Sequence, residues 1–175
     1  MFDPTAFDNM KVVIEGALYD KDSNGDIVII DRNDLINMAK MSRRFNVSFQ
    51  VPNSSITAVI EMEAKLVNLA AELIPSSLSG QLAGCHVKLQ FSLDHQNGKM
   101  DYHAMEAILL NVWGVTRKIT MAVHYNPLEI ENKVSNVITV EFGRLIGEDQ
   151  LDDLVEMTEV MTTTIQELEH FYNQI

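Results

Sequence analysis

Four segments of the sequence alternate between apolar and polar residues, and this pattern limits the possible folds more than any other feature. They are residues 45–51, 86–94, 118–125 and 136–142. Neighbouring side chains of a β-strand point to opposite faces, so each segment predicts a strand with one buried and one solvated face. Strands of this kind are typical of an antiparallel sheet that is covered on one side.

Two Asn-Gly pairs predict tight turns, because this dipeptide readily adopts the positive φ angles of a two-residue hairpin. Asn24-Gly25 separates residues 11–19 from residues 26–31, and both runs are rich in β-branched residues. The second pair, Asn97-Gly98, follows residues 86–94 and predicts a return strand from residue 101. For residues 101–112 a strand is favoured, with a helix as the alternative because the segment contains strong helix formers.

Three segments predict helices. Residues 34–43 have the spacing of a short helix, and residues 53–74 predict a long one that ends at Pro75. The polar residues of 53–74 form one narrow stripe, so this helix should be covered on more than one side. Residues 148–175 predict the second long helix. The expected fold is therefore α+β: a mainly antiparallel sheet with two β-hairpins and further strands, and two long helices packed on one face.

The chain is expected to form one domain over residues 1–175. Its 175 residues are enough for a single core that buries about 70% of the unfolded surface. A loop rich in serine and glycine, residues 75–84, joins two possible pseudo-halves, residues 1–75 and 85–175.

Charge and cysteine content narrow the classes of function. Acidic residues number 25 and basic residues 13, which gives a net charge of −12. Nucleic acids and anionic membrane surfaces are therefore not expected as partners. No apolar run reaches the roughly 18 residues of a membrane-spanning helix. The single cysteine, Cys85, cannot form an intrachain disulfide, which favours a cytoplasmic location.

Residues 20–31 resemble the calcium loop of the EF-hand family. Oxygen-bearing side chains stand at loop positions one, three and five, glycine at six and a carboxylate at twelve. The resemblance implies these ligands: Asp20, Asp22, Asn24, the backbone carbonyl of Asp26, and Asp31. Position twelve is Asp where the family has a bidentate Glu, and the preceding segment predicts a strand. A plain hairpin turn is therefore favoured, no metal or other cofactor is predicted, and calcium binding is the alternative function.

No catalytic motif is found in the sequence. It contains no HExxH, CxxC, GxSxG or GxGxxG pattern, so enzymatic activity is not expected. A second alternative is a small-molecule-binding protein or enzyme with a site on the predicted 86–125 sheet. Its candidate cleft is formed by Tyr102, His103, Glu106 and His124.

The helix predicted for residues 148–175 is the expected contact element. Its apolar residues cover two adjoining stripes, and one sheet surface can cover only part of that arc. The expected function is that of a cytoplasmic, non-catalytic protein-interaction protein, a homodimer or the binder of another protein. The predicted contact residues are Met157, Val160, Thr164 and Phe171 with the acidic flank Glu156 and Glu159. Alternatively, the helix predicted for residues 53–74 hides this surface within one chain.

Overall fold

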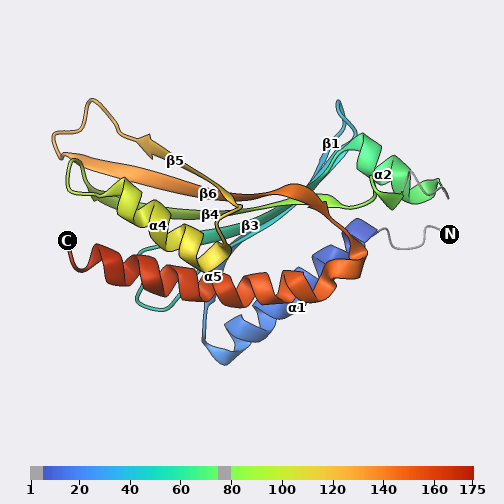
Figure 1. Ribbon diagram of the computed structural model, residues 1–175, viewed down its shortest axis with the longest axis horizontal. Coiled ribbons are helices and arrows are strands. Elements are labelled where there is room, and N and C mark those ends of the chain that lie inside the picture. Colours follow the sequence, from blue (N-terminus) through green and yellow to red (C-terminus); the bar gives the residue numbers. More distant parts are fainter. Residues whose placement is uncertain (1–5, 75–79) are drawn as a thin grey trace.

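The computed structural model describes residues 6–74 and 80–175, and its centre is one antiparallel sheet (Figure 1). The strand order in the sheet is β1-β2-β3-β4-β6-β5. The strands are β1 (Val28–Asn37), β2 (Ser42–Gln50), β3 (Thr57–Ala64), β4 (Cys85–Gln96), β5 (Lys118–His124) and β6 (Lys133–Ile146). Strands β3 and β4 are paired, so the sheet is continuous across the two possible pseudo-halves.

Three helices lie against one face of the sheet (Figure 1): α1 (Ala6–Asn24), α4 (Tyr102–Trp113) and α5 (Leu151–Tyr172). A short 3₁₀ helix, η1 (Glu148–Gln150), precedes α5, and α5 contacts both α1 and α4. The core between helices and sheet contains the fully buried rings of Phe7, Phe45, Phe49 and Phe91. A further short helix, α2 (Leu66–Leu73), lies at one end of the sheet.

The expected fold class is confirmed. The four alternating segments coincide with β2, β4, β5 and β6, and most of their apolar side chains are buried or half-buried against the core. Val123 and Tyr125, at the end of the third segment, are exposed. The predicted helix 148–175 is formed by η1 and α5. No helix among the described residues is long and apolar enough to cross a membrane.

The first predicted hairpin is wrong, because residues 11–19 belong to helix α1. One stripe of α1 faces the core and is fully buried. It consists of residues at helical spacing: Phe7, Met10, Ile14 and Leu18. Gly25, with φ +80°, ends the helix instead of turning a hairpin. The backbone N–H of Asp26 donates to the carbonyl of Lys21, as in a glycine-terminated helix end.

The predicted short helix over residues 34–43 is also wrong. This segment contains the end of β1, a turn and the start of β2, with Ile36 paired to Arg43. The Asn37 side chain accepts hydrogen bonds from the backbone N–H groups of Ala39 and Lys40. Such a local side-chain turn, together with cross-strand pairing, prevails over helix spacing.

The predicted helix over residues 53–74 is two elements, strand β3 and helix α2. Ala58, Ile60, Met62 and Ala64 alternate with less apolar residues and face the core, so the dense apolar content is that of a central strand. The helices that pack beside α5 are consequently α1 and α4. The predicted helix end at Pro75 lies outside the described residues.

The predicted second hairpin is replaced by helix α4. Asp101 caps this helix, because its side chain accepts a hydrogen bond from the backbone N–H of Ala104 at 3.0 Å. Gly114, with φ +98°, follows its last residue. The helix formers of residues 101–112 therefore decide the structure, which makes the favoured strand wrong and the helix alternative right.

Candidate functional site

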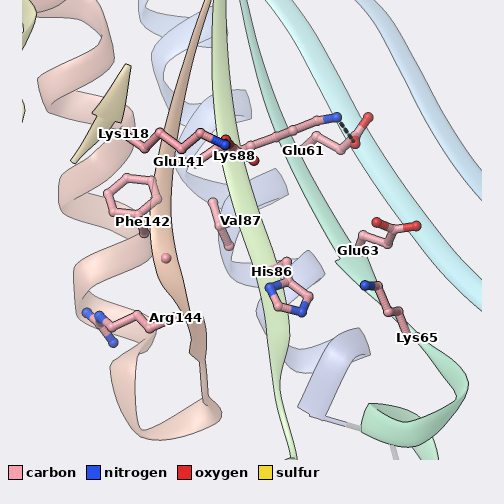
Figure 2. A pocket seen from close by; sticks show the side chains of 11 residues that line it. Glu61, Glu63, Lys65, His86, Val87, Lys88, Lys118, Glu141, Phe142 and Arg144 are labelled. Carbon is pink, nitrogen blue, oxygen red and sulfur yellow. Dashed lines mark ion pairs between the residues drawn. The ribbon is translucent and has the colours of Figure 1, made fainter. Parts of the chain in front are cut away.

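A charged depression of about 370 Å³ lies on the face of the sheet opposite the helices (Figure 2). Strands β3, β4, β5 and β6 and the start of α2 supply its lining. Its charged residues are Glu61, Glu63, Lys65, His86, Lys88, Lys118, Glu141 and Arg144.

Most charges of this depression neutralise one another. The ammonium group of Lys88 lies 2.9 Å from the buried carboxylate of Glu61, and Lys118 lies 3.0 Å from Glu141 (Figure 2). Arg44 is within 4 Å of both Glu61 and Glu63. A charged ligand would have to displace these pairs, so the depression is better explained as a network that stabilises the solvated sheet face.

A smaller hollow of about 290 Å³ lies where β4 ends beside the last turn of α5. His95 borders it and is buried, but both ring nitrogens have neighbours. Nδ1 lies 3.0 Å from the carbonyl of Gln96, and Nε2 lies 3.5 Å from the Tyr102 hydroxyl. These contacts satisfy the imidazole within the protein.

The four residues of the candidate cleft, which belongs to the second alternative function, do not come together. Tyr102, His103 and Glu106 lie on α4, where the exposed His103 ring is 3.9 Å from the Glu106 carboxylate. The Tyr102 ring packs edge-on against His95 instead of His103. His124 is exposed on β5 and borders a hollow beside Asp94 and Lys133, which Tyr102, His103 and Glu106 do not line.

The five residues that the EF-hand resemblance implies as calcium ligands do not form one group. Asp20, Asp22 and Asn24 belong to the last turns of α1, whereas Asp31 is part of β1. The Asp22 carboxylate accepts a hydrogen bond from the Ile29 backbone N–H, and the Asp31 carboxylate accepts one from the Asn33 amide. The EF-hand-like loop is not formed, because its first half is helical. In residues 6–74 and 80–175 no three His, Cys, Asp or Glu side chains are grouped to hold a metal.

The predicted contact residues of α5 pack mainly against other elements of the same chain. Met157 and Thr164 are buried, and Val160 and Phe171 are half-buried against the core. Glu156 and Glu159 are exposed, and Glu159 accepts a hydrogen bond from the Lys21 ammonium at 2.7 Å. The intramolecular cover that was assigned to residues 53–74 is provided by α1 and α4.

Thr164 has a definable role inside the protein. Its hydroxyl accepts a hydrogen bond of 3.0 Å from the indole N–H of Trp113, which joins α5 to α4. Thr164→Val keeps the shape but leaves a buried donor unpaired, so we expect the free energy of unfolding to fall by about 1–2 kcal/mol. Thr163→Val, at an exposed position, is the control, with an expected change below about 0.5 kcal/mol.

Urea unfolding followed by tryptophan fluorescence measures both variants, because the chain has one tryptophan. Equal stability of Thr164→Val and Thr163→Val would contradict a structural role of the Thr164 hydroxyl.

An exposed apolar surface at one end of the sheet escaped prediction. We call it the tip–α2 patch; it consists of Met38 and Met41 at the β1–β2 turn and Leu66, Val67, Leu73 and Ile74 at α2. Arg43 of β2 pairs with Ala64 of β3, so the residues before Arg43 and after Ala64 lie at the same end of the sheet (Figure 1). Each of the six side chains is at least 50% exposed.

The sequence contained a partial signal for this patch. Its six residues are apolar, but they occur in segments 34–43 and 53–74, where the spacing of apolar residues predicts the buried face of a helix. Only the corrected strand assignments place them outside the core.

Comparison with known proteins assigns no family to the chain. No protein-family model, curated protein or solved structure matches it. The function must therefore be inferred from the surface of the molecule.

Proposed function

We propose that the chain is a non-catalytic, cytoplasmic protein that binds another protein through the tip–α2 patch. The observation that carries the proposal is the exposure of this patch, which reaches 74% at Met38 and 68% at Leu73. Contiguous exposed apolar side chains are typical of interaction sites, because a partner that covers them removes apolar area from water.

The patch supports binding better than the other candidate surfaces do. The charged residues that line the depression around Glu61 pair with one another. The polar groups that border the hollow at His95 already have hydrogen-bond partners. Most of the apolar arc of α5 packs on the core. In contrast, the methionines and α2 side chains of the patch project into solvent. Methionine also adapts its shape readily to a partner.

Charge around the patch indicates the chemistry of the partner. Lys40, in the β1–β2 turn, and Lys65, at the start of α2, form no ion pair within the described residues. Two unpaired cations beside an apolar surface favour a partner segment with apolar residues and acidic flanks. The chain as a whole has a net charge of −12, so the rest of its surface would repel a partner segment with acidic flanks.

The cytoplasmic location is supported by the environment of Cys85. This free thiol is fully buried, and burial raises its pKa to about 12. A protonated, inaccessible thiol without a disulfide partner fits a reducing compartment.

Variants of α2 test the proposed function. Affinity-tagged protein is used to recover its partner from native cells, and the purified partner is then titrated with Val67→Asp and Leu73→Asp. Each buried charge should weaken the complex at least about tenfold. Val115→Asp, at a valine outside the patch that is more exposed still (84%), should bind like the original chain. Equal affinity of all three variants would contradict the proposal.

A further inference from the structure

Strand β1 is an unpaired edge that is unusually accessible. It is ten residues long, eight of them exposed, and no described strand lies on its outer side. Val28, Ile30, Leu35 and Ile36 are all at least 49% exposed. Edge strands are commonly blocked by lysine, proline, inward-pointing charges or β-bulges. Strand β1 has no lysine or proline, and its inward-pointing charges Arg32 and Asp34 are already paired with α1. Its bulge at Ile30 leaves residues 31–35 regular.

Residues 31–35 are complementary to a second copy of themselves. In an antiparallel pair centred on Asn33, Arg32 of one copy lies opposite Asp34 of the other, twice by symmetry. Both side chains are on the helix-covered face, because they stand opposite Val47 and Phe45 of β2. The same register places Asp31 opposite the partner's Leu35, and Ile36 opposite the bulge at Ile30, where the strand is no longer regular. The self-complementarity of the register therefore rests on the two Arg32–Asp34 pairs.

Helix α1 extends this complementary surface above the strand. Lys11 of α1 pairs with Asp34, and Glu15 of α1 pairs with Arg32. Tyr19 lies one turn beyond Glu15, and Val12 lies two turns before Tyr19, so both are on the β1 side of the helix. Val12 is 60% exposed and Tyr19 44%. A second copy joined at β1 would bring its own α1 beside this stripe.

The acidic helix α5 would stay away from such a junction. Helix α5 contacts both α1, which contacts the edge strand β1, and α4, which contacts the opposite edge strand β5. Helix α5 therefore lies inward of the β1 edge. Two copies joined at β1 therefore keep their α5 carboxylates apart, which limits the repulsion between chains of net charge −12.

We propose that the protein forms a symmetric dimer in which the β1 strands of two copies pair antiparallel around Asn33 and the two α1 helices lie side by side. The sheet then continues from one copy into the other. The proposal extends the proposed protein-binding function by naming a second surface, and it needs no residue of the tip–α2 patch.

The molecular mass in solution is the first test. Light scattering at about 100 µM should give twice 19.7 kDa for the original chain. Ile36→Lys should give the monomer mass, because each of the two copies then contributes one lysine to the junction between the β1 strands. We expect the dissociation constant of the dimer to rise about 100-fold. Val123→Lys, the matched change on the opposite edge strand β5, should remain dimeric. A monomeric original chain, or a dimeric Ile36→Lys, would overturn the proposal.

A disulfide tests the register independently of mass. Directly opposite residues of antiparallel strands are close enough for a disulfide, so Asn33→Cys should form a covalent dimer on mild oxidation. Thr120→Cys on β5 should not, and buried Cys85 should not contribute. Absence of the Asn33→Cys dimer would overturn the register. If the protein is monomeric but Val67→Asp still loses partner binding, only the dimer proposal is rejected. If the protein is dimeric but Val67→Asp binds the partner as the original chain does, only the proposed function is rejected.

Discussion

Leu89→Ala is expected to lower the free energy of unfolding by about 3 kcal/mol, a typical cost for a leucine truncated in a close-packed core. Leu89 is fully buried in β4, between β3 and β6. Truncation removes its apolar contacts and leaves a cavity that neighbouring strands cannot close. The same substitution at Leu128, which is 90% exposed, should cost less than about 0.5 kcal/mol.

Urea unfolding of both leucine variants gives the comparison, with tryptophan fluorescence and circular dichroism as two probes. A difference below about 1 kcal/mol between them would contradict the placement of β4 at the centre of the core.

Gly84→Ala is expected to destabilise the protein by about 3 kcal/mol, from backbone strain and a steric clash together. Gly84 has φ +135°, and an added Cβ would lie 2.6 Å from the backbone carbonyl oxygen of Ile146. This oxygen belongs to the end of β6, beside the first residue of β4, so it cannot move without loss of strand pairing.

Gly98→Ala is the matched control for this clash. Gly98 also has a positive φ, +81°, but an added Cβ would meet nothing within 4 Å. It should cost about 1 kcal/mol, from the left-handed backbone alone. Thermal or urea unfolding measures both glycine variants. Equal losses of stability in the two variants would show that the clash of the added Cβ with the Ile146 carbonyl oxygen does not contribute to the free energy of unfolding.

The sequence predicts correctly the strands whose side chains alternate with a period of two. Residues 86–94 and 136–142 alternate because one sheet face packs on helices and the other is solvated. This pattern is local, so it can be recognised without knowledge of the neighbours. The acidic first turn and apolar stripe of residues 148–175 likewise specify a helix locally.

Errors arise where one segment satisfies two periods. Residues 11–19 contain three consecutive β-branched residues, which favour a strand, but the stripe through Met10, Ile14 and Leu18 fits a helix, and one face of the sheet covers that stripe. Residues 57–64 are apolar enough for a buried helix, yet β2 and β4 flank them as a central strand. Tertiary packing outweighs intrinsic propensity in both segments.

The candidate binding surface could not be predicted, because exposure depends on which elements cover which residues. Phe171 and Leu73 are both large and apolar, but α5 presses the first against the core while α2 leaves the second in solvent. The sequence therefore indicates that apolar surface exceeds what one sheet can cover, but it does not indicate that α2 and the β1–β2 turn carry exposed apolar side chains.

Photo-crosslinking in native cells tests the binding surface most directly. A photoreactive amino acid at Val67 should give one discrete adduct with another protein, because α2 lies in the tip–α2 patch. The same group at Glu156, exposed on α5, should give none. The opposite result, an adduct from position 156 and none from position 67, would contradict binding through the patch and return the contact surface to α5.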